Sequence, residues 1–401
     1  GGGQSALYAA REIRKNNTDV EITILGEEKF IPYERPPLSK DFLLNKKVDE
    51  DLYFCSKETL EEEKINYLNT TISKVDFENN ILVSEDNKHY FYDTLLISTG
   101  SKNKKLNINS EIDDEILYLR NLEEAKNIKE KTLGKKNILI IGGGFIGLEI
   151  ASSFSQLNKN INLVEVGKQL MGRIIPNQIA DLVKQFHEDE GNKIILNKKI
   201  SEITKKDEKY KILLSDNTEI ISDLIIAGIG SIPNVGLFEN TKLKLDNGIV
   251  TNEFCETNIN NVFAAGDVSN FYHPFFGKYM RLETYQHAQN HGISAGKNIS
   301  GIKTEYSSIP WMWSDQFNLN LQLTGVCDDY DEIVERGKSI DDGIIYFFLK
   351  NKNIKGACGL GIAGKVGRDI RITSKLTEKN TIVDSSILSD QSQKLNKLIQ
   401  K

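Results

Sequence analysis

The chain has 401 residues, of which 39% are hydrophobic and 27% are charged, and its formal net charge at pH 7 is −6. This length predicts two or three domains, the acidic balance argues against a large nucleic-acid interface, and no apolar stretch reaches the roughly 18 residues of a membrane-spanning helix. Four scattered cysteines without a CxxC pair exclude a disulphide framework and suit a reducing cytoplasm.

The first motif is a glycine-rich segment, Gly1 to Ala6, that reads as G-x-G-x-x-A and runs into a helical pattern. A β-branched strand pattern follows at residues 20–25, and Glu27 comes at roughly the 20-residue distance expected of a ribose-binding acid. Such glycines let a pyrophosphate approach a helix N-terminus. A flexible tag remnant is the alternative interpretation. If the segment is a dinucleotide loop, the first strand of its domain is missing before Gly1.

A second motif of the same kind is complete. The apolar strand pattern of residues 137–141 runs into the G-x-G-x-x-G of Gly142 to Gly147, a helical pattern follows, and the strand pattern of residues 160–164 ends at Glu165. This order predicts a second dinucleotide-binding domain. A carboxylate at the ribose position repels a 2′-phosphate and so favours NAD over NADP. The nearby Lys168 and Arg173 limit that preference.

Two such motifs predict two bound dinucleotides; the alternative is that one Rossmann-like domain is empty. After about residue 306 the pattern changes to short strand segments, which predicts a separate C-terminal α+β domain. No H-E-x-x-H motif occurs, and neither a metal site nor a serine hydrolase is predicted. The other strand patterns are residues 71–75, 81–84, 94–98, 224–227, 261–265, 319–323 and 344–349.

Two longer strings are more specific than either glycine loop: Arg-Pro-Pro-Leu-Ser-Lys at 35–40 and Pro-Trp-Met-Trp-Ser-Asp-Gln at 310–316. With them, the chain resembles the NADH-dependent, FAD-containing ferredoxin reductases of bacterial Rieske dioxygenase and haem monooxygenase systems, over almost its whole length. These are glutathione-reductase-like pyridine nucleotide-disulphide oxidoreductases without the redox disulphide. The resemblance also rests on Gly1–Gly3, Thr99-Gly100, Leu119-Arg120, Gly142–Glu149 and Ala265–Asp267.

The resemblance implies an α/β fold with two Rossmann-like dinucleotide-binding domains, one for FAD and one for NAD, plus a C-terminal α+β domain. The expected FAD-binding domain is discontinuous, with residues 1–105 and 229–305, and lacks its first strand at the N-terminus. The expected NAD-binding domain spans residues 106–228, and the C-terminal reductase domain spans 306–401.

The activity that the resemblance implies is hydride transfer from NADH onto FAD, followed by single-electron transfer to a [2Fe-2S] ferredoxin that feeds an oxygenase. No cysteine pair is available to take the electrons, because Ser39 and Lys40 stand where related enzymes carry a flavin-proximal cysteine. Rubredoxin, a quinone or dioxygen are alternative acceptors, and an NADH-sensing protein resembling apoptosis-inducing factor is an alternative of another class. We further expect a cytoplasmic monomer or weak homodimer that binds neither membrane nor nucleic acid.

Lys40 and Glu149 are the expected catalytic pair. In the family, the lysine of the first string lies by the flavin ring and the glutamate after the second loop lies by the nicotinamide. An ammonium there stabilises negative charge on a reduced ring, and a facing carboxylate keeps the pair neutral. Without the resemblance, Lys40 would be a surface lysine and Glu149 a first-turn acid favoured by the helix dipole.

The other expected roles concern the cofactors. Arg35 and Arg120 match positions near the FAD phosphates, with surface salt bridges as the alternative. Asp267 matches the position that binds the ribityl chain, with a helix N-cap as the alternative; Tyr285 and Trp313 match positions at the flavin. The full set of implied cofactor-binding residues is Gly1, Gly3, Ala6, Glu27, Arg35, Lys40, Ile72, Thr99, Gly100, Arg120, Gly142, Gly144, Phe145, Ile146, Gly147, Glu149, Glu165, Gly230, Asp267, Tyr285 and Trp313.

Charge is unevenly distributed in the last quarter of the chain. Residues 350–379 hold eight lysines and arginines against two acids, whereas residues 328–342 hold seven acids against two bases. Since small ferredoxins are usually acidic, the basic stretch could steer one to the C-terminal domain at low salt. The alternative is a solvated charged surface without a partner.

Overall fold

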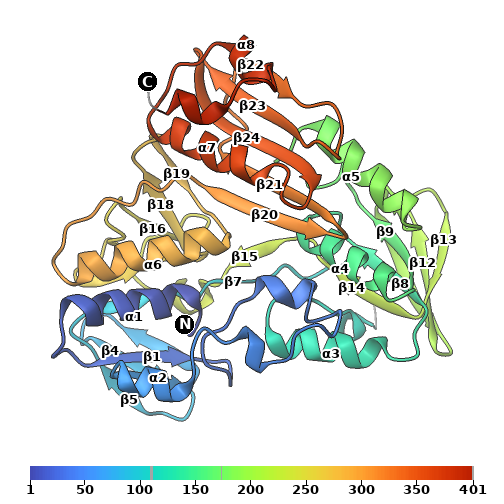
Figure 1. Cartoon of the computed structure of the whole chain (residues 1–401). Coiled ribbons are helices and arrows are strands. Elements are labelled where there is room, and N and C mark those ends of the chain that lie inside the picture. Colours follow the sequence, from blue (N-terminus) through green and yellow to red (C-terminus); the bar gives the residue numbers. More distant parts are fainter. Residues whose placement is uncertain (109–111, 173, 400–401) are drawn as a thin grey trace. The chain divides into compact units, whose positions relative to one another are not determined.

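The computed structural model describes residues 1–108, 112–172 and 174–399 (Figure 1). The chain forms two compact units, each assembled from separate stretches of sequence. The first unit comprises residues 1–34, 49–102 and 231–308, and the second comprises residues 35–48, 103–230 and 309–401. Both units mix helices with parallel and antiparallel strands, which confirms the predicted α/β class.

Two helices of the first unit, α1 (Gln4–Asn16) and α6 (Tyr285–Ile299), lie side by side (Figure 1). Glycines allow this close packing. A Cβ on Gly292 would overlap the carbonyl oxygen of Ser5, and one on Gly296 would lie 2.7 Å from that of Ala9. The two backbones therefore meet almost directly, which fixes the N-terminal end of α1 against α6.

The strands of the first unit form several small sheets. β1 pairs with β2 and β6 pairs with β17, both in parallel, as expected of a dinucleotide-binding domain. Antiparallel strands make up the β3-β4-β5 sheet. The elements are β1 (Ile22–Gly26), α2 (Lys57–Glu62), β2 (Ile65–Asn69), β3 (Ile72–Asp76), β4 (Ile81–Ser84), β5 (His89–Phe91), β6 (Leu95–Ile97), β7 (Ser101–Asn103), β15 (Ser231–Pro233), β16 (Ile249–Thr251), β17 (Val262–Ala264), β18 (Ser269–His273) and β19 (Lys278–Met280).

The second unit contains a four-stranded parallel sheet in the order β10-β9-β8-β14. Its central strand β8 is an almost continuous apolar run and is buried, as is typical of a parallel sheet. An antiparallel sheet, β11-β12-β13, adds buried side chains to the same core. The elements are α3 (Leu122–Thr132), β8 (Asn137–Ile141), α4 (Phe145–Gln156), β9 (Asn160–Val164), α5 (Asn177–Asp189), β10 (Lys193–Ile195), β11 (Ile200–Lys206), β12 (Lys209–Leu214), β13 (Glu219–Ser222) and β14 (Leu224–Ala227).

The C-terminal stretch of the second unit forms a five-stranded antiparallel sheet in the order β20-β21-β24-β23-β22. Helix α7 lies against β21 and β24 (Figure 1). The segment 344–349 is buried at every position, because Ile345, Phe347 and Leu349 pack in one cluster with Ile370 and Leu376 of α7. The elements are β20 (Trp311–Gln316), β21 (Leu319–Gly325), β22 (Glu332–Arg336), β23 (Ile344–Lys350), β24 (Asn353–Ile362), α7 (Gly367–Glu378) and α8 (Ser385–Ser389).

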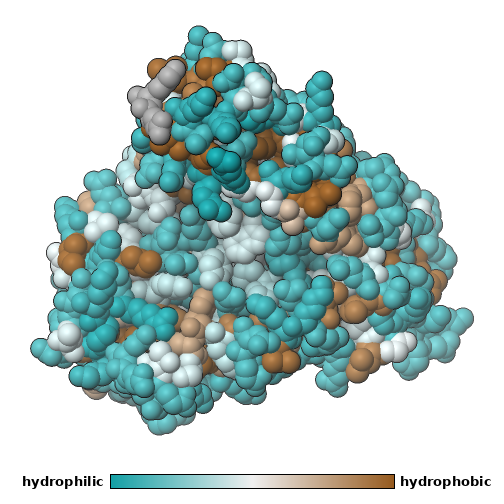
Figure 2. Space-filling model, in the orientation of Figure 1, coloured by the Kyte–Doolittle hydropathy of each residue, from teal (hydrophilic) through white to brown (hydrophobic). Residues whose placement is uncertain are grey.

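Hydrophilic residues cover most of the surface shown in Figure 2, and hydrophobic residues appear there in small separate groups. Such scattered apolar groups are ordinary for a protein surface. Within the described part of the chain, every helix is too short or too polar to cross a lipid bilayer.

Candidate functional site

The loop between β8 and α4 is shaped by its glycines. A Cβ on Gly142 would overlap the carbonyl oxygen of Gly228, and one on Gly147 would overlap that of Gly142. Gly142 also adopts a φ of +105°, which favours glycine. Gly144 differs, because a Cβ there would meet no described atom within 4 Å, and no described side chain caps the helix that begins after it. The loop thus presents an open helix N-terminus, which is a ready anion site.

Glu165, directly after β9, reaches back to this loop. Its Oε2 accepts a hydrogen bond from the Gly143 amide at 2.6 Å, and its Oε1 accepts one from the Gly167 amide at 2.6 Å. Each carboxylate oxygen keeps capacity for a further donor such as a ribose hydroxyl. Lys168 is exposed nearby, and Arg173 lies outside the described residues.

Two predicted residues, Phe145 and Ile146, open α4. Phe145 is half-buried, and Ile146 is 43% exposed. Gly230, which lies beyond β14, has a φ of +101° and accepts a hydrogen bond from the Lys104 amide at 3.0 Å. The structure therefore brings the predicted residues of the second loop to one end of the parallel sheet.

The first glycine segment has the same design. A Cβ on Gly1 would overlap the carbonyl oxygen of Ser98, whereas one on Gly3 would meet no described atom within 4 Å. No described side chain caps α1, and buried Gln4 Nε2 and Ser5 Oγ have no hydrogen-bond partner among the described residues. An open helix end, a glycine cradle and two buried polar atoms without partners fit a dinucleotide pyrophosphate. Ala6 is buried in α1, and Glu27 is exposed after β1.

The remaining predicted residues of the first unit lie at strand ends. Thr99 Oγ1 donates to the carbonyl oxygen of Asn234 at 2.8 Å, next to Gly100, whose φ is +69°. Ile72 begins β3 and is half-buried. Asp267 follows β17, and its Oδ2 accepts from Ser101 Oγ at 3.4 Å. The next element is strand β18, so the helix N-cap interpretation of Asp267 is wrong.

Tyr285 is the first residue of α6, and Thr284 caps this helix by accepting from the His287 amide. Tyr285 Oη donates to Glu34 Oε1 at 3.1 Å. Burial and the negative charge of Glu34 raise the pKa of Tyr285 above its ordinary value. The phenol therefore stays neutral at physiological pH and acts as a hydrogen-bond donor.

Lys40 and Glu149 form an ion pair within the second unit, with 3.3 Å between Lys40 Nζ and Glu149 Oε1. Their side chains are 16% and 5% exposed, so the surface-lysine interpretation of Lys40 is wrong. Glu149 is the fifth residue of α4 and not a first-turn acid, so that alternative is also wrong. Lys40 Nζ lies 3.8 Å from a second carboxylate, Asp315 Oδ2.

Two serines complete the surroundings of Glu149. Ser39 Oγ donates to its Oε2, and Ser314 Oγ donates to its Oε1 at 2.7 Å. Both hydroxyls are buried, so they hold the carboxylate in one orientation. Sequence reasoning missed Ser39 and Ser314 as site residues, although both lie inside the two specific strings.

Strand β20 places an aromatic side chain beside the ion pair. Trp313 Nε1 donates to Asp315 Oδ2 at 3.0 Å, and Lys40 Nζ lies 5.6 Å from the Trp313 ring centroid. Trp311 stacks on Trp313 at 5.0 Å. Because successive side chains of a strand point to opposite faces, Trp313 and Asp315 lie near the Lys40 ammonium, whereas Ser314 contacts the Glu149 carboxylate.

The two predicted phosphate-binding arginines are neighbours in the second unit. Arg35 Nη1 donates to the carbonyl oxygen of Arg120 at 2.8 Å, and both side chains are half-buried.

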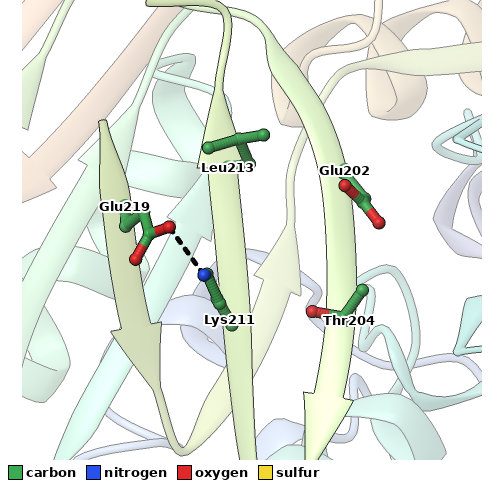
Figure 3. Close-up of a pocket in the computed structure, with 5 residues that line it drawn as sticks. All are labelled: Glu202, Thr204, Lys211, Leu213 and Glu219. Atoms are coloured by element: carbon green, nitrogen blue, oxygen red, sulfur yellow. Dashed lines mark ion pairs between the residues drawn. The ribbon is translucent and has the colours of Figure 1, made fainter. Parts of the chain in front are cut away.

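A pocket on the β11-β12-β13 sheet is separate from the sites described above and has other lining residues (Figure 3). Its polar side chains come from three neighbouring strands, and Lys211 pairs with Glu219 at 2.6 Å. None of the predicted site residues lines it; its lining residues are Glu202, Thr204, Lys211, Leu213 and Glu219.

Residues 1–292 match the family described as pyridine nucleotide-disulphide oxidoreductase. The chain belongs to this family. Residues 311–399 match a second family, described as reductase C-terminal. As a pyridine nucleotide-disulphide oxidoreductase, the chain is an enzyme of a family that uses FAD and NAD(H), which confirms the two predicted cofactors.

Several known members of the pyridine nucleotide-disulphide oxidoreductases are similar over most of the chain. The 3-phenylpropionate/cinnamic acid dioxygenase ferredoxin–NAD(+) reductase component of Photorhabdus laumondii is 30% identical, covering 96% of this chain and 97% of the relative. A rubredoxin–NAD(+) reductase of Ectopseudomonas oleovorans is 32% identical, covering 83% of this chain and 87% of the relative. The solved covalent putidaredoxin reductase–putidaredoxin complex superposes with a TM-score of 0.94 at 26% identity, covering 100% of this chain and 97% of that chain.

This pyridine nucleotide-disulphide oxidoreductase has no disulphide of its own, since its four cysteines, all within the described residues, are free. Burial raises the pKa of Cys55, and it raises the pKa of Cys327 to about 12. Cys255 and Cys358 are fully buried. Thiols with raised pKa values are weak nucleophiles and poor partners for disulphide exchange.

Proposed function

We propose that the chain is a flavoprotein reductase that takes hydride from NADH and delivers single electrons to a [2Fe-2S] ferredoxin of an oxygenase system. The observation that carries this proposal is the buried Lys40–Glu149 pair, whose carboxylate is oriented by Ser39 and Ser314. The similarity to a dioxygenase ferredoxin–NAD(+) reductase component over nearly the full chain supports the choice of acceptor.

Bound FAD supplies the hydride acceptor and the ability to release electrons one at a time. The open N-terminus of α4 binds the pyrophosphate of NADH, and Glu165 accepts from its ribose hydroxyls. Glu149 orients the nicotinamide, and Lys40 contributes positive charge near the reacting rings. Lys40 and Glu149 carry opposite charges, and each charge partly offsets the other.

The same proposal assigns the other cofactor contacts. In the first unit, Gly1, Gly3, Glu27 and Asp267 bind FAD. The assignment of Arg35 and Arg120 to the FAD phosphates stays a prediction, as does the three-domain division at residues 105, 228 and 305. We further propose a cytoplasmic monomer or weak homodimer. The four free cysteines support the reducing compartment.

The electrons leave for an external acceptor, because the four thiols are free and have raised pKa values. We place the docking site for the ferredoxin on the exposed basic face of α7. Arg368, Arg371 and Lys375 are spaced by three and four residues, so they share one face of the helix, and all three are exposed. We name these three residues the α7 basic stripe.

The test follows electrons through the purified protein. We expect anaerobic addition of NADH to bleach the flavin bands, and subsequent reduction of cytochrome c to require added ferredoxin. Equal rates of cytochrome c reduction without ferredoxin would contradict the proposal. A rubredoxin that supports faster turnover than any ferredoxin would favour the second candidate, which the similarity to rubredoxin–NAD(+) reductase suggests.

A further inference from the structure

The Lys40–Glu149 pair is one end of a longer line of buried polar side chains in the second unit. Ser314 Oγ donates to Glu149 Oε1 at 2.7 Å, and Gln316 Nε2 donates to Ser314 Oγ at 3.1 Å. Gln316 Oε1 lies 2.9 Å from Nε2 of His187, a residue of α5. The line ends at Asn192, whose Nδ2 lies 3.1 Å from His187 Nδ1. The five residues beyond Lys40, from Glu149 to Asn192, are each at most 4% exposed.

The carboxylate end fixes the direction of these hydrogen bonds. Paired with Lys40, an ionised Glu149 can only accept, and the Ser314 hydroxyl has a single hydrogen to donate. Ser314 therefore gives that hydrogen to Glu149 and accepts from Gln316 Nε2. This orientation turns Gln316 Oε1 toward His187 Nε2, which must carry the ring hydrogen. Each bond then points toward the carboxylate.

The opposite direction would cost Glu149 a donor. If His187 carried its hydrogen on Nδ1, the Gln316 amide would turn over to donate to Nε2. Its oxygen would then face Ser314, and the only hydrogen of the hydroxyl would go to Gln316. The tautomer of the His187 imidazole is thus coupled to whether Ser314 donates to the Glu149 carboxylate.

We propose that His187 is a positioning residue for Glu149: its Nε2 hydrogen orients Gln316, and Gln316 aims the Ser314 hydroxyl at the carboxylate. The inference rests on the proposed function, in which Glu149 orients the nicotinamide. It adds a residue outside every motif of the sequence. It also assigns β20 a task in the reaction, because this strand carries both intermediate side chains.

The surroundings of His187 suit this role. The imidazole is fully buried, and its ring meets Phe317, in the turn between β20 and β21, at 5.1 Å in an edge-on arrangement. The Phe317 amide donates to Ser152 Oγ of α4 at 2.6 Å, which ties the turn to the helix of Glu149. Burial lowers the pKa of His187 to about 4. The ring is therefore neutral near pH 7, and its Nδ1 can accept from Asn192.

The first experiment needs no turnover. Histidine ring nitrogens labelled with ¹⁵N report which nitrogen carries the hydrogen, and the His187 signals are those lost in His187→Gln. In the holoprotein at about pH 7 we expect a neutral ring with its hydrogen on Nε2. A hydrogen on Nδ1, or a doubly protonated ring, would overturn the proposal.

The second experiment measures flavin reduction by NADH in a single turnover. His187→Phe removes the donor, and we expect the limiting rate to fall about tenfold, as for loss of one hydrogen bond to a charged group, with little change in the Kd for NADH. His187→Gln retains an N–H donor and should restore most of the rate. Phe186→Leu is the matched control, since Phe186 also packs on Phe317 but has no part in the line, and it should keep the wild-type rate.

The double variant separates this role from a merely structural one. If His187 acts through Ser314, adding His187→Phe to Ser314→Ala should lower the limiting rate of flavin reduction little further than Ser314→Ala alone. Additive losses, or a Kd that rises as much as the rate falls, would overturn the inference. The proposed function fails by a different result, namely wild-type flavin that NADH does not reduce, and the ¹⁵N measurement still decides the direction of the hydrogen bonds in that case.

Discussion

At the scale of single residues, the Glu165 carboxylate accepts hydrogen bonds from two backbone amides, and we propose that it also accepts from a ribose. We expect Glu165→Arg to shift coenzyme preference toward NADPH, since a guanidinium attracts the 2′-phosphate that a carboxylate repels. The measurement is the ratio of kcat/KM for NADH and NADPH. Glu165→Gln, which removes only the charge, is the control and should give an intermediate ratio. Unchanged selectivity in Glu165→Arg would count against the assignment.

The Lys40–Glu149 pair allows a thermodynamic test. Lys40→Met leaves a buried carboxylate without its cation, so we expect it to lower the free energy of unfolding by about 3 kcal/mol. Glu149→Gln keeps one acceptor oxygen for a serine hydroxyl and leaves no buried charge at this position, so it should cost less. In the double variant, part of the loss from Lys40→Met should be recovered, because position 149 no longer carries a buried unpaired charge. Urea denaturation measures all three, and strictly additive losses would show that the two charges do not interact.

At the scale of elements, two glycines of the loop before α4 are expected to have different roles: one is needed for folding and the other for binding NADH. A Cβ on Gly147 overlaps the backbone of Gly142, so we expect Gly147→Ala to lower the melting temperature. Gly144 has a φ of −78°, and a Cβ there would meet no described atom within 4 Å, so Gly144→Ala should fold normally. It should still bind NADH more weakly, because the methyl group would enter the space where we propose that a phosphate binds. Thermal unfolding and NADH titration of both variants check this contrast. A Gly144→Ala protein with wild-type affinity would remove the loop from the binding site.

Helix α7 offers a test of docking. Reversing the α7 basic stripe with Arg368→Glu, Arg371→Glu and Lys375→Glu should raise the KM for ferredoxin at low salt by about tenfold or more and weaken its dependence on ionic strength. Ferricyanide reduction should stay unchanged, since a small inorganic oxidant needs no such surface. Ferredoxin reduction by the wild type that does not respond to salt would contradict the steering idea.

The sequence predicted the elements whose side-chain patterns are local. The strands that enter and leave the second glycine loop, and the C-terminal sheet, lie where they were expected. Local patterns did not show that β18 follows Asp267, and they did not identify Ser314 as a partner of Glu149. Glu149 and Ser314 are 165 positions apart, and only the packing of β20 against α4 brings them together. His187 carried no motif, so no sequence signal connected it to the site.

At the scale of the whole molecule, buried histidines set the response to acid. Burial lowers the pKa of His187 in the second unit and of His287 in the first unit to about 4. Since both take up protons on unfolding below about pH 6.5, the stability that these two neutral imidazoles contribute is complete above that pH and is lost as the pH falls toward 4. At pH 5 each should cost about 2 kcal/mol. Chemical denaturation at pH 7 and pH 5 measures this loss.

A matched pair of variants isolates the effect. His187→Gln removes one titrating group and should reduce the loss between pH 7 and pH 5. His89→Gln, at an exposed position, should leave it as in the wild type. Equal pH dependence in both variants would show that buried histidines do not govern acid stability.

The line from Glu149 to Asn192 also bears on how such chains can recombine during evolution. Two of its residues belong to β20, and the other three belong to the stretch around α4 and α5. A crossover between diverged relatives near residue 309 would exchange an entire C-terminal segment, which belongs to the same compact unit as Glu149 and His187. The Gln316 of one relative would then lie beside residue 187 of the other relative. We therefore expect chimaeras at this junction to keep the hydrogen-bonded line only when both parents carry matching residues at positions 187, 314 and 316.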